Sequence, residues 1–142
     1  MKRSRGKREC EAGQALVEFA LVVPILLILV IGVFEFGRAW NSHQTITDAA
    51  REGARRAVIF DAAVTQTEVE DTIRSVLASS ALKPARATIT FPDGFHTGTG
   101  NVTSVRIVYP YQFQFLAPFI RLVADSPEGT INLATEARMR NE

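Results

Sequence analysis

A long apolar run near the amino end constrains this chain more than any other feature of its sequence. From Ala15 to Phe34 the side chains are almost all apolar, and Glu18 is the single charged residue among them. In an α-helix these 20 residues extend about 30 Å, which is close to the thickness of the hydrocarbon core of a bilayer. A small soluble domain seldom buries a helix that is apolar on every side. The sequence therefore predicts a membrane-spanning helix.

The distribution of basic residues predicts the orientation of that helix. Five lysines and arginines lie within residues 2–8, whereas residues 35–54 contain only Arg38 and Arg51. Because basic flanks stay in the cytoplasm, we expect the amino end inside and the carboxyl part outside. A cleavable secretory signal is the alternative, but its apolar core is about 7–15 residues long and ends at a small-x-small site. The run here is longer and no such site follows it, so we favour a single-pass anchor.

Glu18 lies inside the apolar run, only three residues after Ala15. A carboxylate costs about 2.5–3.5 kcal/mol at the centre of a spanning helix and less near its end. One interpretation is that the side chain extends to the cytoplasmic interface and has no further role. The other is that it pairs with a positive group that a neighbouring chain supplies at the same depth. Its position alone does not decide between them.

Beyond the apolar run, the sequence predicts that the helix continues through residues 38–60. No clear helix terminator occurs there. Small residues recur at helical spacing and form a narrow face, in which we select Ala49, Gly53 and Ala57 as candidate helix-packing residues. A face of alanine and glycine lets another backbone come close. We favour packing of this face on the protein's own sheet, and contact with another subunit is the alternative.

The second half of the chain predicts one further helix and three strands. Thr67 is a candidate N-cap with Glu70 three residues later, which together make a capping box, and the helix should end near Ala81. Alternation of apolar and polar residues predicts strands over 87–91, 105–115 and 131–137. Pro110 implies an edge position or a bulge in the second strand.

The segment 115–123 joins the last two strands and is densely apolar. It could close the core as a short helix that begins near Pro118, or it could form an exposed patch. We favour core closure. The apolar face of the second strand should include Phe115, together with Val105, Ile107, Tyr109, Tyr111 and Phe113.

These elements together predict a membrane-anchored α+β protein. A long amino-terminal transmembrane helix should extend into a small head, in which one or two helices pack on a roughly three-stranded antiparallel sheet. The expected organisation is a basic leader over residues 1–13, a transmembrane helix over 14–37, a helical extension over 38–60 and the α+β head over 61–142.

The residue types that carry catalysis or bind metals are sparse. His43 and His96 are the only histidines and lie far apart, and the single cysteine, Cys10, precedes the apolar run. No phosphate loop, nucleophile motif or metal-ligand spacing occurs. The formal net charge of +1 also argues against a nucleic-acid binder. We therefore expect no enzymatic activity, no metal, no cofactor, no small-molecule substrate and no nucleic-acid partner.

Three stretches carry a resemblance to a known family: 13–20 (Gly-Gln-Ala-Leu-Val-Glu-Phe-Ala), 34–38 (Phe-Glu-Phe-Gly-Arg) and 49–55 (Ala-Ala-Arg-Glu-Gly-Ala-Arg). The first, between a basic leader and an apolar helix, resembles the cleavage region of type IV pilin-like precursors. In this order the three stretches resemble the TadE-like proteins of the tight-adherence (Tad, or Flp pilus) assembly system. The likeness extends more loosely to the carboxyl end.

The resemblance implies roles for four residues. A prepilin peptidase would cut between Gly13 and Gln14, and Glu18 would then be fifth in the mature chain, at the position of the family's assembly glutamate. Phe19 follows it where the main Flp pilins usually have tyrosine. This departure, together with the large carboxyl domain, favours a minor pilin or pseudopilin over the major pilin.

The implied cut is consistent with the charges of the chain. It would remove five basic and two acidic side chains and change the formal net charge from +1 to −2. It would also create an amine at Gln14, one helical turn from Glu18. This amine could partly neutralise Glu18 in its own chain or in a neighbouring helix, which would give a carboxylate within the membrane a partner.

The resemblance thus implies a structural subunit for assembly of tight-adherence pili or the related secretion apparatus. Its implied partners are the prepilin peptidase, other pilin-like subunits and the Tad assembly-platform proteins. The implied location is the bacterial cytoplasmic membrane, and the resemblance leaves open whether the protein enters the pilus. The alternative function is a membrane-anchored extracytoplasmic binding module without an assembly role.

Overall fold

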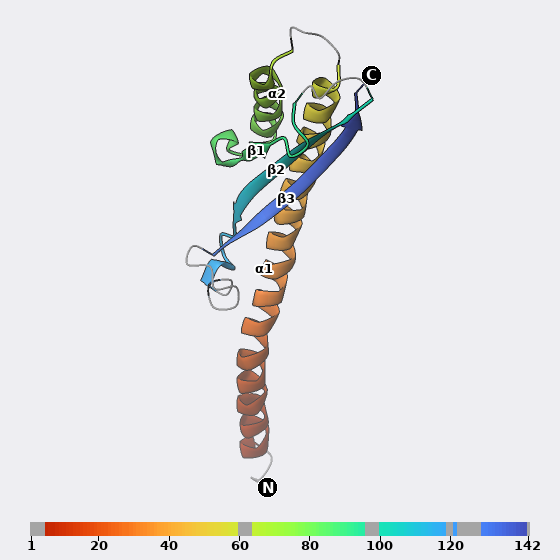
Figure 1. Ribbon diagram of the computed structural model, residues 1–142. Helices are drawn as coiled ribbons and strands as arrows, with labels where there is room; N and C mark the ends of the chain where they lie inside the picture. The colour runs from red at the N-terminus through yellow and green to blue at the C-terminus, as the bar shows by residue number, and fades with distance from the viewer. Residues whose placement is uncertain (1–4, 60–63, 96–99, 119–120, 122–128, 142) are drawn as a thin grey trace.

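The computed structural model describes residues 5–59, 64–95, 100–118, 121 and 129–141, with side chains from Gly13 onward. It consists of a long helix and a small head (Figure 1). The elements in chain order are α1 (Arg5–Ala57), α2 (Gln66–Ser79), the short 3₁₀ helix η1 (Pro84–Arg86), β1 (Thr88–Thr90), β2 (Val102–Gln112) and β3 (Thr130–Arg140). The predicted α+β class is confirmed: a long apolar helix precedes a second helix and a three-stranded antiparallel sheet.

Helix α1 is 53 residues long and continues through Pro24 as one element. Its amino-terminal half projects from the head as a stalk (Figure 1), which we define as Gly13–Phe34. The mean hydropathy of its most apolar stretch is 2.9, so α1 is long and apolar enough to cross a membrane. Apart from Glu18, the stalk has neutral side chains on all sides, and a helix satisfies its own backbone groups within hydrocarbon.

The sheet has the order β1-β2-β3, with both pairs antiparallel. Ile89 of β1 lies opposite Ile107, and Tyr109 lies opposite Leu133 of β3. The inward-facing residues of β2 are buried against α1 and α2, which confirms the predicted alternation. The buried core contains Ile46, Ala50, Val69, Ile73, Leu77, Val105, Ile107 and Tyr109.

Pro110 lies in β2 beyond the last β1 pair, which joins Thr88 to Val108. β2 is the central strand of the sheet but has no β1 neighbour at Pro110. The missing N–H of the proline therefore leaves no β1 carbonyl without a partner. Of the edge position and the bulge that Pro110 implied, the structure has the local edge position.

Helix α2 begins earlier than predicted, so the assignment of Thr67 as N-cap was wrong. The N-cap is Thr65, whose hydroxyl accepts a hydrogen bond from the backbone N–H of Glu68 at 3.2 Å. Thr65 and Glu68 satisfy the same three-residue capping spacing as Thr67 and Glu70. The buried face of α2 consists of Val69, Ile73 and Leu77.

The predicted face of the second strand was wrong at its end. β2 stops at Gln112, and Phe115 is 66% exposed because the chain bends after Phe113. Ala117, Pro118 and Arg121 are helical, as expected for a short helix near Pro118. Residues 119, 120, 122 and 123 of the segment 115–123, and His96, lie outside the described residues. β3 begins at Thr130 and contains the whole predicted strand 131–137.

Candidate assembly surface

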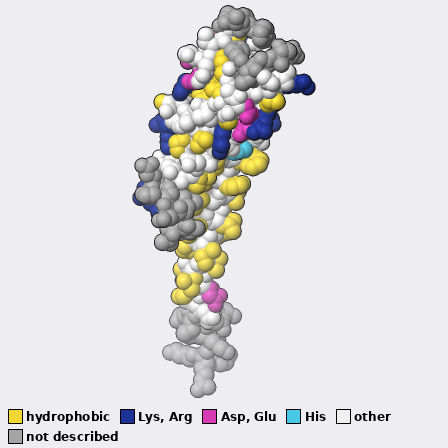
Figure 2. All heavy atoms as spheres, viewed as in Figure 1, with side chains coloured by type: hydrophobic (Ala, Val, Ile, Leu, Met, Phe, Trp, Pro, Cys, Tyr) yellow, Lys and Arg dark blue, Asp and Glu magenta, His cyan; other side chains and the backbone are white. Residues whose placement is uncertain are grey.

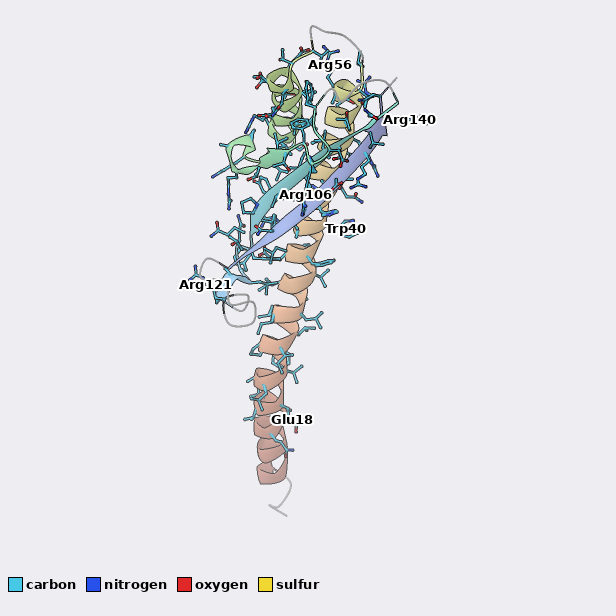
Figure 3. All side chains as sticks on the ribbon, in the orientation of Figure 1. Glu18, Trp40, Arg56, Arg106, Arg121 and Arg140 are labelled. Carbon is cyan, nitrogen blue, oxygen red and sulfur yellow. The ribbon has the colours of Figure 1, made fainter. Side chains whose placement is uncertain are left out.

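The residues that the sequence selected for processing and assembly lie at the start of the stalk, well away from the head. Gly13, Gln14, Glu18 and Phe19 are all exposed, and nothing lies within 4 Å of the position that a Cβ on Gly13 would take. The side-chain amide of Gln14 donates a hydrogen bond to Glu18 Oε1 at 3.0 Å. Figure 3 shows Glu18 on the free part of α1. The backbone on either side of Gly13 is therefore uncovered by the head.

The apolar side chains of the stalk are not covered by the protein's own head. None of the most apolar stretch of α1 is buried inside the molecule, and Figure 2 shows apolar side chains along the stalk. Phe34 at the end of the stalk is 72% exposed, and exposure continues past it, since Phe36 and Trp40 are 66% and 58% exposed. An exposed apolar surface of this extent requires lipid or a partner protein.

An apolar groove continues this surface onto the head. Its volume is about 330 Å³, and Trp40 and Phe36 of α1 form one wall. The indole of Trp40 stacks on the His43 ring at 6.1 Å between centroids, and both rings line the groove. The groove is lined by Phe36, Ala39, Trp40, His43, Phe113, Ile131 and Leu133. Because it begins where the stalk ends, the stalk and the groove form one apolar strip, which we call the lateral strip.

A buried carboxylate joins the head to α1 at the level where the stalk ends. Glu35 is 1% exposed, and its Oε2 accepts hydrogen bonds from the backbone N–H groups of Gln114 at 2.7 Å and Phe115 at 3.2 Å. Its Oε1 accepts a hydrogen bond from Arg38 at 3.1 Å, and Arg38 also donates to the Gln114 side chain at 2.8 Å. We call these residues (Glu35, Arg38, Gln114 and Phe115) the junction.

The junction sets where the head attaches along α1. A carboxylate that accepts several hydrogen bonds is a strong, directional tie, and buried charge is tolerated only when it is paired in this way. The sequence analysis missed Glu35, although it lies in a stretch that carries the family resemblance. The available signal was a lone carboxylate directly after an apolar run, with an arginine three residues later.

The candidate helix-packing residues lie in the part of α1 that the head covers. Ala49 and Ala57 are completely buried. A Cβ on Gly53 would lie 2.5 Å from Cδ1 of Ile73 in α2, so glycine is needed for the close approach of the two helices. This face of α1 is therefore occupied by the protein's own α2 and sheet.

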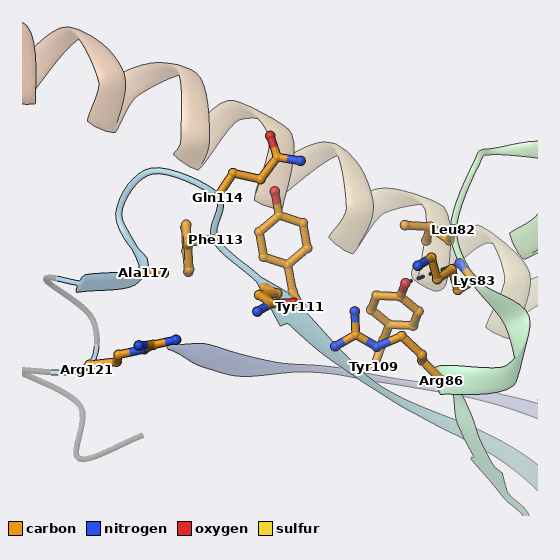
Figure 4. Close-up of a pocket in the computed structure, with 10 residues that line it drawn as sticks. Leu82, Lys83, Arg86, Tyr109, Tyr111, Phe113, Gln114, Ala117 and Arg121 are labelled. Carbon is orange, nitrogen blue, oxygen red and sulfur yellow. Dashed lines mark hydrogen bonds between the residues drawn. The ribbon is translucent and has the colours of Figure 1, made fainter. Parts of the chain in front are cut away.

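Two tyrosines of β2 differ in how their hydroxyl groups are satisfied. The Tyr109 hydroxyl accepts a hydrogen bond from the backbone N–H of Lys83 at 3.2 Å. The Tyr111 hydroxyl is buried without a hydrogen-bond partner among the described residues and points toward α1 (Figure 4). Burial raises the pKa of Tyr111, against an opposing effect of the Arg38 charge, so the phenol stays protonated at neutral pH.

Replacing each tyrosine with phenylalanine should separate these two environments. Tyr109→Phe should lower the free energy of unfolding by about 1 kcal/mol, because the Lys83 N–H loses its acceptor. Tyr111→Phe should leave stability unchanged or raise it, because it removes a buried hydroxyl that has no partner. Urea unfolding of the full chain in detergent measures both. A larger loss for Tyr111→Phe than for Tyr109→Phe would contradict this description.

The described residues contain no group of three or more histidine, cysteine, aspartate or glutamate side chains that could hold a metal ion. His43, the one histidine that the structure describes, stacks on Trp40 in the groove. The chemistry that this surface offers is thus apolar contact along the lateral strip, with one carboxylate at its start.

Residues 13–55 match the family model described as TadE-like protein, which confirms the resemblance that the sequence motifs carry. The matched region contains the stalk, Glu18 and the Glu35–Arg38 half of the junction. No curated protein and no solved structure matches the chain.

Proposed function

We propose, from the premise that residues 13–55 match the TadE-like family, that this chain is a minor pilin-like structural subunit of the tight-adherence system. The match associates the chain with Tad pili and, with the apolar helix, with a membrane. The single observation that supports a subunit role best is that α1 joins the motif of residues 13–19 to an apolar strip that the head leaves uncovered.

The first step in this proposal is removal of the leader. A prepilin peptidase would cut between Gly13 and Gln14, at a point where the head covers neither residue. The new amine at Gln14 would lie one turn from Glu18, whose Oε1 already accepts a hydrogen bond from the Gln14 side chain. Charge pairing with the amine of a neighbouring helix would then bring adjacent subunits into register.

The second step is lateral packing. The lateral strip fits an apolar helix that runs alongside α1, because its apolar character continues from the stalk into the groove at Trp40. The junction would keep the head in a fixed place on α1 while a neighbour packs beside it. The proposed partners are accordingly other pilin-like subunits and the assembly platform, with the head on the extracytoplasmic side of the cytoplasmic membrane. This role needs no catalytic residue and no cofactor.

A crosslink from the groove tests this proposal. A photoreactive phenylalanine derivative at Trp40 should crosslink to another pilin-like subunit of the same system in intact cells. The matched control is the same derivative at Arg106, which is exposed on β2 between the buried residues Val105 and Ile107 and so faces away from the core. Mass spectrometry identifies the crosslinked chain.

The alternative function, an anchored binding module without an assembly role, makes the opposite prediction. A binding module without an assembly role is not expected to place its groove against a pilin-like chain. Equal yields from positions 40 and 106, or no pilin-like chain among the products at position 40, would therefore contradict the assembly proposal.

A further inference from the structure

A second pocket lies on the head and is distinct from the apolar groove. Its volume is about 520 Å³, and it opens between η1 and the end of β2 (Figure 4). Three basic side chains, Lys83, Arg86 and Arg121, line it together with the amides of Gln112 and Gln114. No carboxylate is among its lining residues. We call this the basic pocket.

The charges of the basic pocket are not neutralised within the part of the chain that the structure describes. Several other arginines there make ion pairs with carboxylates, whereas Lys83, Arg86 and Arg121 make none. Three cations that share one concave site repel one another unless an anion joins them. The basic pocket therefore favours an anionic ligand.

Tyr109 contacts the Arg86 cation and the backbone of Lys83. The Arg86 guanidinium lies 5.9 Å from the centroid of its ring, a cation–π contact. The Tyr109 hydroxyl accepts from the Lys83 backbone N–H. The Arg86 guanidinium is thus positioned before a ligand arrives, and its planar group suits two oxygens of a phosphate.

One end of the basic pocket lies near the level where the stalk ends. The pocket next to it shares Leu82 and Tyr111 with it and extends to Val33 and Phe34 of α1. Figure 3 places Arg121 on the part of the head toward the stalk, on the Glu18 side of Trp40.

The residues around this level have the composition of a membrane interface. Phe34, Phe36 and Phe115 are 66–72% exposed there. Trp40 and the basic side chains Arg38 and Arg121 are also exposed near this level. Tryptophan beside basic side chains at the end of an apolar helix is typical of the depth at which lipid headgroups lie.

We propose that the basic pocket binds the phosphate of an anionic phospholipid in the leaflet that faces the head. Arg86 and Lys83 contact the phosphate oxygens, Arg121 adds charge on the side toward the stalk, and Phe115 lies among the upper acyl chains. The head then rests on the bilayer surface in a fixed orientation. This inference requires α1 to span a membrane but does not depend on a role in pili.

Lipid titration of the full-length protein in detergent micelles, read by native mass spectrometry, tests the proposal. The probes are phosphatidylglycerol and phosphatidylcholine with identical acyl chains. The wild-type protein should bind phosphatidylglycerol more tightly, and Lys83→Gln/Arg86→Gln should weaken that binding by about an order of magnitude while leaving phosphatidylcholine unchanged. The matched control, Arg51→Gln/Arg106→Gln, removes the same charge at exposed positions outside the pocket and should bind as the wild type does.

A third variant keeps the test decisive if the double substitution disturbs packing on Tyr109. Arg121→Gln, whose side chain is exposed, should weaken phosphatidylglycerol binding by about fivefold.

Equal binding by the pocket variants and the control would overturn the proposal. Displacement of phosphatidylglycerol by an equal concentration of inorganic phosphate would assign the pocket to free phosphate instead. Displacement by an acidic peptide would assign it to a protein partner.

Discussion

Replacing Glu18 with glutamine should abolish co-assembly with other pilin-like subunits and leave the protein in the membrane at its normal level. On the proposed role, the carboxylate attracts the Gln14 amine of a neighbouring helix, and a neutral amide of the same shape cannot supply that attraction within a bilayer. We expect recovery with the other subunits to fall by at least about tenfold, which corresponds to a loss of about 1.4 kcal/mol in pairing free energy. Co-purification, together with a count of surface pili, measures this loss.

Glu18→Ala is the companion variant, because it separates insertion from assembly. An unpaired carboxylate near the interface opposes insertion, so its removal should leave membrane residence unchanged or improved. Co-assembly should fail as badly as with glutamine, while cleavage after Gly13 persists. Normal assembly of Glu18→Gln would mean that charge is not the signal, and Glu18 would then be a tolerated interfacial residue.

Replacing Glu35 with alanine should loosen the head from α1. The substitution removes the acceptor of two backbone N–H groups, at Gln114 and Phe115, and of the Arg38 guanidinium. Hydrogen bonds to a charged group contribute about 1.5–3 kcal/mol each. The freed N–H groups and Arg38, which is partly exposed, can bind water instead. We therefore expect a net loss of about 2–3 kcal/mol in the free energy of unfolding, with faster amide exchange at Gln114 and Phe115.

The matched control for Glu35→Ala is Glu52→Ala. Glu52 also pairs with an arginine three residues later, and its hydrogen bond from Arg55 lowers the pKa of its carboxyl. Both partners are solvent-accessible, so this pair should contribute less than about 1 kcal/mol. Urea unfolding of both variants in detergent compares them, and a loss for Glu35→Ala no larger than for Glu52→Ala would show that the junction does not hold the head.

The periodic parts of this fold could be predicted from the sequence because each depends on a repeating pattern. The apolar run predicted the stalk, and the alternation of Val105, Ile107 and Tyr109 predicted the inner face of β2. The N-cap could not be fixed, because Thr65 and Thr67 both have a glutamate three residues later and only the packing of α2 chooses between them. Phe115 follows the alternation but lies beyond the bend at the junction.

Part of the candidate site could likewise be predicted from the sequence, and part of it could not. Residues 13–19 could be selected because this local stretch, together with the following helix, resembles the cleavage region of pilin-like precursors. The junction and the basic pocket could not, since they join residues that are far apart in the sequence: Glu35 with Gln114, and Lys83 with Arg121. Such long-range pairs depend on how β2 crosses α1, which no local pattern determines.

The central claim is that this chain is processed as a pilin-like precursor, and the intact mass of the membrane-extracted protein tests it most directly. In cells with an active prepilin peptidase the mass should correspond to residues 14–142, and without the peptidase to the full chain. Gly13→Val should give the full-length mass in both backgrounds. Recovery of only the full-length mass from the wild-type protein in cells with an active peptidase would contradict the account.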